Sequence, residues 1–320
     1  MAPAIVGWLL DKGFWSPFPR TSRRSMIVEV CGLLTHDSGK TWLSVNLVKS
    51  LRRLGLRTAI HKPVAGHSAW YQMEAIEKSM ELGMLVGSDV ATYIESLGVS
   101  REEIPVVNPI DLLLAPPDPS RYLAGGLRKY IEHAEEHMTQ LVMARLTLED
   151  GAPRHLLVKE NLARLTPSMR RVVEKLAERV GAEEASLEDV VLALRSRATE
   201  MALLRMLDTL EKRSDIVVVE SFNDAVVPYI AIAPRLSILI AVAPGWVGIY
   251  TEIGELIRSI ETEIGLRGEE GLRSPYPLSR LRPAASIEIP PARTMADYDQ
   301  RAVSRLVDII VQRLRKPTPA

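Results

Sequence analysis

The sequence predicts an α/β protein with a doubly wound, mostly parallel sheet. Residues 26–31 form an apolar run typical of a buried strand, and a stretch with helical periodicity follows. Residues 215–220 and 236–243 are continuous β-branched runs, as expected of strands covered on both faces. Alternation of such strands with amphipathic helices favours a parallel sheet with crossover connections.

The first βαβ unit is predicted near the N-terminus. A strand over 26–31 precedes a helix over 41–54, which Gly55 ends. A short strand over 57–61 follows, and Pro63 ends it because proline cannot donate a backbone hydrogen bond.

The middle of the chain predicts helices and one hairpin. Residues 106–123 are expected to be an irregular loop, because proline is dense there. An Asp-Gly turn signal between the runs "QLVMARLT" and "HLLVKENL" predicts a β-hairpin. Amphipathic periodicity predicts the remaining helices of this part, over 69–83, 88–98, 166–180 and 186–212.

The C-terminal part continues the α/β pattern. We expect a helix over 247–263, a strand over 285–291 and a helix over 295–315. The whole pattern predicts one domain over 26–320 that contains a mainly helical insertion at about 124–200. Residues 1–25 are predicted to be a poorly ordered extension, with a short helix over 4–11 as the alternative.

Composition limits the classes of function. The 320 residues are 47% hydrophobic and 25% charged, with 40 basic and 40 acidic side chains. This balance gives no reason to expect a nucleic-acid or membrane surface, and no apolar run approaches the roughly 20 residues of a membrane span. The single Cys31 excludes an intrachain disulfide, fits a reducing cytoplasm and is expected to be a buried thiol.

A phosphate-binding loop is predicted where the first strand meets the first helix. Gly39-Lys40-Thr41 matches the end of a Walker A motif, although Leu34 stands where the standard motif has glycine and the nearest glycine is Gly32. The alternative is a plain strand–helix turn with an exposed lysine. The residues expected to bind nucleotide are Thr35, His36, Asp37, Ser38, Gly39, Lys40, Thr41 and Trp42.

The loop and four later segments resemble dethiobiotin synthetase, a P-loop NTPase family. Besides the widely spaced loop glycine, the segments "HKPVAGHS", "GSDVATYIESLG", "VVNPIDLLLAPPDP" and "SDIVVVES" follow in the order of that family. The resemblance covers residues 26–123 and 213–250, and it implies the P-loop NTPase type of fold.

The resemblance also implies roles at matching positions. Lys40 and Lys62 would stabilise the phosphoryl group during its transfer from ATP, and Thr41, Asp89 and Glu220 would hold Mg²⁺. Carboxylates and a hydroxyl are ligands that Mg²⁺ prefers, and ligands bind at the carboxyl edge of such sheets.

Each of these residues also has a plainer interpretation. Lys62 could be a solvated strand-end lysine, and Asp89 could cap the helix that follows it. Glu220 is harder to explain in this way, because isolated carboxylates avoid the ends of apolar strands. Asn223 and Asp224 could orient Glu220 or a water molecule, or could only shape a turn.

The acceptor stays open, because the sequence departs from the family around it. Gly66 replaces a substrate-contacting serine, and His67 beside it could contact substrate or be a polar loop residue. The resemblance implies a cytoplasmic homodimer that transfers phosphate to a carboxylate or carbamate of an unidentified small molecule, or hydrolyses ATP. One alternative is a regulatory or assembly NTPase, with the apolar "EMALLRML" as its contact face. Another is an amidating synthetase similar to the cobyrinate a,c-diamide family, with an external source of ammonia.

Overall fold

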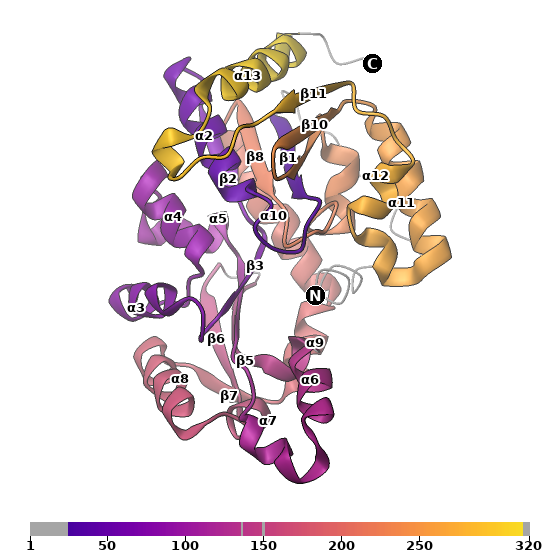
Figure 1. Cartoon of the computed structure of the whole chain (residues 1–320). Coiled ribbons are helices and arrows are strands. Elements are labelled where there is room, and N and C mark those ends of the chain that lie inside the picture. The colour runs from indigo at the N-terminus through magenta and orange to yellow at the C-terminus, as the bar shows by residue number, and fades with distance from the viewer. Residues whose placement is uncertain (1–24, 136, 149–150, 316–320) are drawn as a thin grey trace. The chain divides into compact units, whose positions relative to one another are not determined.

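The computed structural model describes residues 25–135, 137–148 and 151–315 (Figure 1). The predictions for residues 1–24 therefore lie outside the described residues. The chain divides into two compact units. One comprises residues 64–203, and the other comprises the stretches before and after it, up to Pro63 and from Leu204 onward. We describe each unit by itself.

The discontinuous unit is built on a six-stranded sheet in the order β11-β10-β9-β1-β8-β2. The pairs β9–β1, β1–β8 and β8–β2 are parallel, and β10 is antiparallel to both of its neighbours. The strands are β1 (Met26–Gly32), β2 (Thr58–His61), β8 (Ile216–Glu220), β9 (Ile238–Ala243), β10 (Trp246–Tyr250) and β11 (Ala285–Glu288).

Helices pack on this sheet through apolar faces. Helix α13 lies along α2 (Figure 1), and Gln300 Nε2 donates to Asn46 Oδ1 at 3.0 Å. The buried face of α13 repeats at helical spacing, from Ala302 through Leu306 to Ile310, which explains why this segment is a helix. The helices of this unit are α2 (Lys40–Arg53), α11 (Ile253–Arg267), α12 (Pro275–Ser279) and α13 (Gln300–Arg315), and α10 (Arg197–Arg213) runs across the unit boundary.

The continuous unit has its own five-stranded sheet in the order β3-β4-β5-β6-β7. Its outer pairs, β3–β4 and β6–β7, are parallel, whereas β4–β5 and β5–β6 are antiparallel. The segment 124–200 thus contributes three strands as well as helices. The strands are β3 (Val64–Ser68), β4 (Ile110–Leu114), β5 (Leu141–Thr147), β6 (Pro153–Val158) and β7 (Glu183–Ala185).

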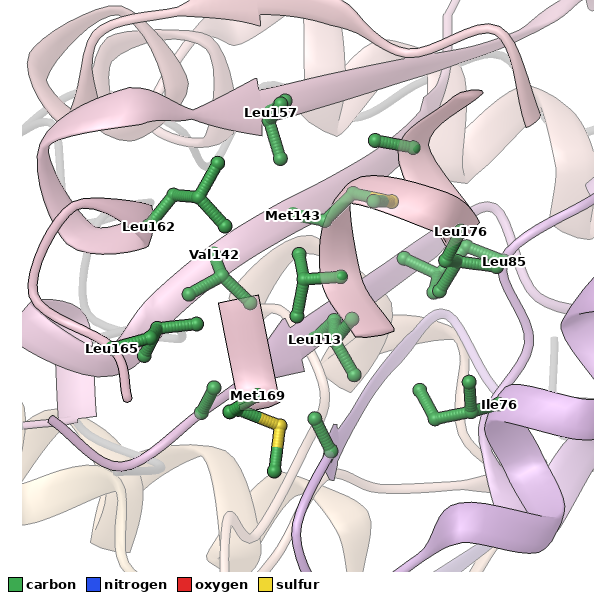
Figure 2. Packing of buried hydrophobic residues seen from close by; sticks show 14 residues of the cluster. Ile76, Leu85, Leu113, Val142, Met143, Leu157, Leu162, Leu165, Met169 and Leu176 are labelled. Atoms are coloured by element: carbon green, nitrogen blue, oxygen red, sulfur yellow. The ribbon is translucent and has the colours of Figure 1, made fainter. Parts of the chain in front are cut away.

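A hydrophobic core fills one side of this second sheet (Figure 2). Side chains such as Leu113 and Met143 project from the strands toward Leu176 of α8. Burying one such side chain contributes about 1.5–3 kcal/mol. The helices of this unit are α3 (Met73–Leu82), α4 (Ser88–Leu97), α5 (Ile104–Val107), α6 (Leu127–Glu135), α7 (Lys159–Leu162), α8 (Pro167–Val180) and α9 (Leu187–Leu194).

Short 3₁₀ helices connect several of these elements. They are η2 (Arg101–Glu103), η3 (Pro119–Gly125), η4 (His137–Gln140), η5 (Ile230–Arg235), η6 (Gly268–Leu272) and η7 (Met295–Asp297). Within the described parts of the chain, no helix is long and apolar enough to cross a membrane.

Most predicted elements are confirmed, and the α/β class is correct. The predicted strands over 26–31, 57–61, 215–220, 236–243 and 285–291 correspond to β1, β2, β8, β9 and β11. The hairpin is formed by β5 and β6, with part of its turn outside the described residues. The predicted thiol burial is also confirmed, because Cys31 is free and fully buried.

The loop predicted over 106–123 is wrong. It contains α5, the fully buried strand β4 and η3. Pro109 stands just before β4 and Pro116 stands beyond its end, so no proline occupies a position where the ladder needs its N–H. The segment "IDLLL", apolar apart from Asp111, was the signal for this strand.

Three predicted helix boundaries are also wrong. The helix expected over 186–212 is two helices, because Ser196 Oγ accepts from Thr199 N and starts α10. The helix expected over 247–263 begins as strand β10, since Pro244-Gly245, with Gly245 at φ 80°, turns β9 back on itself. The helix expected over 295–315 begins as η7, and α13 starts at Gln300.

Replacement of Leu176 by alanine tests the core of the continuous unit. Leu176 is fully buried, so Leu176→Ala should lower the free energy of unfolding by about 2–5 kcal/mol. Urea unfolding followed by circular dichroism measures the change. Leu192→Ala is the matched control, because Leu192 in the same unit is 59% exposed and should change stability little. Equal losses in the two variants would contradict this assignment of the core.

Candidate functional site

The loop between β1 and α2, residues 33–39, bends sharply before the helix begins. Asp37 and Gly39 have positive φ angles of 53° and 90°. Gly39 is the residue before the first turn of α2, and no side chain among the described residues caps that turn. The first backbone N–H groups of α2 are therefore not satisfied by a cap, and such groups attract an anion.

Lys40 folds back over the last residue of β1. Its Nζ donates to Ser38 Oγ at 3.1 Å, and both side chains are buried. A Cβ atom on Gly32 would lie 2.3 Å from Ser38 Oγ and 2.7 Å from Lys40 Nζ. Only glycine leaves this space for the ammonium group, so Gly32 has a steric role here that the standard motif assigns to another position.

The other predicted nucleotide-binding residues come from the same loop and from the first turn of α2. His36, Asp37 and Gly39 are exposed, whereas Thr35 and Trp42 are half-buried. The exposed residues lie on the open side of the loop, and the buried Ser38 and Lys40 line its inner side.

Thr41, Lys62 and Glu220 meet at one carboxylate oxygen. Thr41 Oγ1 donates to Glu220 Oε1 at 2.9 Å, and Lys62 Nζ donates to the same atom at 2.7 Å. The Lys62 side chain is 4% exposed and the Glu220 side chain is fully buried. The structure therefore brings together three residues that are far apart in the sequence, and the solvated interpretation of Lys62 is wrong.

Strand order explains this meeting. Glu220 is the last residue of β8, which pairs in parallel with β1 on one side and with β2 on the other. Lys62 directly follows β2, and Thr41 lies in the first turn of α2 beyond β1. The carboxyl ends of neighbouring parallel strands lie at one edge, where open α/β sheets bind their ligands.

Asp89 belongs to the continuous unit. It lies in the first turn of α4, two residues after the cap residue Gly87, and is half-buried. It is therefore not the N-cap residue itself, although an acidic side chain in the first turn favours the helix dipole. Its role as a metal ligand stays a prediction.

Glu29 is a buried acid that the sequence analysis missed. It lies in the middle of β1, is fully buried, and neither of its carboxylate oxygens has a hydrogen-bond partner among the described residues. Burial, and next the charge of Glu220, raise its pKa well above the usual value, which outweighs the opposite effects of Lys40 and Lys62. A glutamate inside a continuous apolar run was the signal for it.

The register of the sheet separates Glu29 from Glu220. Val30 pairs with Glu220, whereas Glu29 pairs with Val219. Successive side chains of a strand point to opposite faces, so the two carboxyl groups project from opposite faces of the sheet. A raised pKa means that Glu29 keeps its proton to a higher pH than an ordinary glutamate, so it offsets the charge of Lys40 and Lys62 less.

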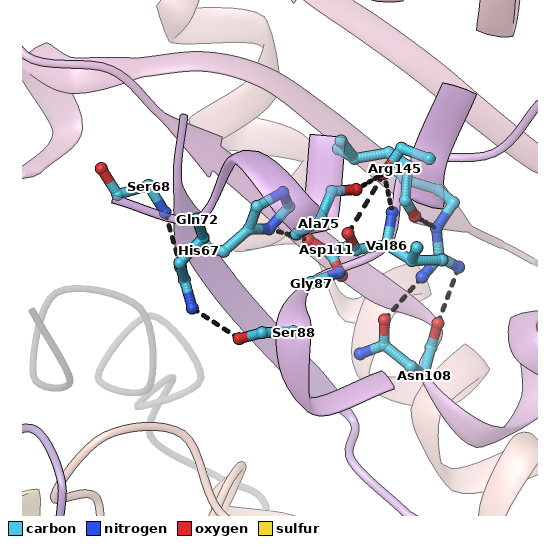
Figure 3. Close-up of polar contacts among 12 residues, drawn as sticks. His67, Ser68, Gln72, Ala75, Val86, Gly87, Ser88, Asn108, Asp111 and Arg145 are labelled. Carbon is cyan, nitrogen blue, oxygen red and sulfur yellow. Dashed lines mark hydrogen bonds and ion pairs between the residues drawn. The ribbon is translucent and has the colours of Figure 1, made fainter. Parts of the chain in front are cut away.

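A second polar cluster lies in the continuous unit (Figure 3). His67 Nδ1 lies 2.9 Å from Asp111 Oδ1, and Asp111 Oδ2 accepts from the backbone N–H of Gly87 at 2.8 Å. Both side chains are almost completely buried. These contacts fix β3, β4 and the start of α4 to one another, so the polar-loop interpretation of His67 is wrong.

Arg145 is the centre of the same cluster. It is fully buried and donates to Leu85 O at 2.8 Å, to Asn108 O at 2.7 Å and to Asn108 Oδ1 at 2.5 Å. Burial lowers the pKa of Arg145 to about 10, so it stays charged at neutral pH. Burial and the charge of Arg145 lower the pKa of His155 to about 4, and neutral His155 Nε2 accepts from Leu85 N at 3.1 Å.

Comparison with protein-family models, with curated proteins and with solved structures finds no match. The described residues contain no group of three or more His, Cys, Asp or Glu side chains that could hold a metal ion by themselves. A metal at the Glu220 site would therefore need oxygen ligands from a hydroxyl, a bound ligand or water, as Mg²⁺ commonly has.

Replacement of Glu29 by glutamine should change how stability depends on pH. The raised pKa means that the folded chain keeps this proton at pH values where the unfolded chain has lost it, so stability falls as pH rises above the usual value of 4.5. Urea midpoints should show Glu29→Gln gaining on the wild type between pH 5.5 and pH 8.

The matched control for this measurement is Glu255→Gln, at an exposed position on α11. It should follow the pH dependence of the wild type. If Glu29→Gln also follows the wild type, the raised pKa assigned to Glu29 is wrong.

Replacement of Arg145 by methionine should destabilise the continuous unit. The variant keeps a similar volume but leaves buried oxygens of Leu85 and Asn108 without donors, at about 1–3 kcal/mol for each unpaired group. Hydrogen exchange of the backbone amides in this unit reports the loss locally. Arg154→Met is the control, because the Arg154 side chain is 54% exposed and bonds only Glu183 in an exposed pair. Comparable losses would contradict the central role of Arg145.

Proposed function

We propose that the chain binds Mg²⁺ and a nucleoside triphosphate, expected to be ATP, in the discontinuous unit. The observation that carries the proposal is the convergence of Thr41 and Lys62 on Glu220, beside a loop whose own Lys40 lies over Gly32. It supports a P-loop NTPase type of fold, in which a strand, a phosphate-binding loop and a helix follow one another.

The donor set fits a magnesium ion. Thr41 Oγ1 and Glu220 Oε1 are 2.9 Å apart, which is about the separation of neighbouring oxygens in an octahedral shell with bonds of about 2.0–2.1 Å. In this proposal Thr41 and Glu220 hold the ion, and Mg²⁺ supplies charge that bridges the outer phosphates. The predicted third ligand, Asp89, belongs to the other unit and stays a prediction.

The lysines have separate tasks in the proposal. Lys40 neutralises phosphate oxygens beside the N-terminus of α2, where the uncapped N–H groups bind them too. Lys62, which donates to Glu220, would also contact the transferring phosphoryl group. The raised pKa of Glu29 lessens the negative charge that opposes these lysines.

The reaction class follows from the resemblance to dethiobiotin synthetase. The chain would transfer the terminal phosphate to a carboxylate or carbamate, or to water. The regulatory alternative loses its one sequence argument, because the apolar stretch "EMALLRML" is largely buried in the folded chain, including Ala202, Leu203 and Leu207. It then offers no exposed contact face.

Replacement of Lys40 by alanine tests the phosphate site. Loss of one charge-assisted hydrogen bond costs about 1.5–3 kcal/mol, so Lys40→Ala should weaken Mg·ATP binding by about 10- to 100-fold. Titration calorimetry measures the affinity, and Mg²⁺-dependent ADP release measures turnover. Lys49→Ala, a half-buried lysine further along α2, is the control and should bind like the wild type. Equal binding by all three chains would sink the proposal.

A further inference from the structure

The segment Leu272–Ser274 ties together the two loops that leave the carboxyl ends of β1 and β8. Ser274 Oγ donates to Gly32 O at 2.5 Å, and Ser274 N donates to Asp224 O at 2.6 Å. Val226 N donates to Leu272 O at 2.9 Å. Arg273 is therefore fixed one residue from a group that touches Gly32, the glycine over which Lys40 lies.

The Arg273 guanidinium is aimed by a buried carboxylate. Arg273 Nε donates to Asp224 Oδ2 at 2.8 Å, and the Asp224 side chain is 2% exposed whereas that of Arg273 is 37% exposed. The second partner, Glu270, is 3.5 Å from Nη1 and 56% exposed, which makes it a weak and replaceable contact. Nη2 takes part in neither ion pair.

The loop that carries Asp224 has a special backbone conformation. Asn223 has a φ angle of 46°, and its buried Nδ2 has no hydrogen-bond partner among the described residues. The left-handed conformation of Asn223 turns the chain shortly after β8 ends at Glu220. The side chain of the next residue, Asp224, can then bond Arg273. Asn223 and Asp224 thus shape a turn, and this turn places the Asp224 carboxylate where it accepts a hydrogen bond from Arg273.

We propose that Arg273 binds the terminal phosphate of the nucleotide and that Asp224 positions it for this contact. The proposal rests on the proposed function and adds a third cation to the site. A guanidinium presents paired N–H groups that match phosphate oxygens, and one edge can stay on Asp224 while the other binds the anion in place of Glu270. We assign Arg273 to the terminal phosphate because it bonds Asp224 in the loop that follows Glu220. Glu220 also holds Lys62, the lysine proposed to contact the transferring phosphoryl group.

Comparison of ATP with ADP separates phosphate binding by Arg273 from a purely structural role, because ADP lacks the terminal phosphate that Arg273 is proposed to bind. Arg273→Gln should weaken Mg·ATP binding by about tenfold or more, as expected for one charge-assisted contact. Mg·ADP binding should stay within about twofold of the wild type. Arg273→Lys should lie between, since it keeps the charge but loses the fork. Asp224→Asn should lower the ATP-to-ADP affinity ratio in the same direction while the thermal midpoint reports any loss of fold.

Arg280→Gln is the matched control. Arg280 also donates its Nε to a buried carboxylate, that of Glu263, and is 45% exposed, but it has no bond to the loop after β1 among the described contacts. It should leave the ATP-to-ADP ratio unchanged. If the full-length wild type does not bind Mg·ATP, the proposed function falls and this inference with it. If the wild type binds but Arg273→Gln leaves the ratio unchanged, or weakens both nucleotides equally, this inference alone is overturned.

Discussion

A carboxylate that has lost all contact with water must find cations and donors inside the protein, and Glu220 is such a group. Its full burial is tolerable because Lys62 and Thr41 both donate to one of its oxygens. These two contacts join the end of β2 and the first turn of α2 to the end of β8. This junction lies beside the loop in which Lys40 is placed over Gly32.

The two units satisfy buried charge in different ways. In the discontinuous unit an anion meets an ammonium group directly, and burial raises the pKa of the nearby Glu29. In the continuous unit the buried cation Arg145 donates only to neutral oxygens, and the neighbouring Asp111 accepts a backbone N–H besides contacting His67. The lysines near Glu220 can also contact a ligand in the proposed function. The polar groups around Arg145 and Asp111 instead hold β-strands and helix starts together.

The sequence predicted the elements whose pattern is local and regular. The apolar run before Gly32 and the helical periodicity after Gly39 were sufficient for β1 and α2, whereas the grouping of Lys62 and Glu220 at one site came from the family resemblance. Strand β4 was missed because flanking prolines outweighed a five-residue segment that is apolar apart from Asp111. Strand β10 was missed because a proline–glycine turn was not weighed against a helical pattern.

Other features could not be predicted from local pattern at all. The second sheet depends on pairing between β3 and β4, in which Val64 lies beside Ile110, and nothing in "VAGHS" specifies that pairing. The contact of Arg273 with Asp224 likewise joins positions 49 residues apart through a turn shaped by Asn223. Such contacts follow from tertiary packing, which is why the aimed Arg273 became visible only in the folded chain, whereas the apolar run around Glu29 was a sequence signal that went unused.

The hydrogen bond from Ser274 to Gly32 spans 242 residues of sequence, and this limits how early the chain can fold during its synthesis. Chains emerge from the N-terminus onward, and compact contiguous regions generally fold as units during synthesis. The unit over 64–203 is complete in sequence when its last residue has emerged, whereas the loop after β1 must wait for Ser274. The loop after β1 is thus completed only after the whole continuous unit and the segment up to Ser274 have been made.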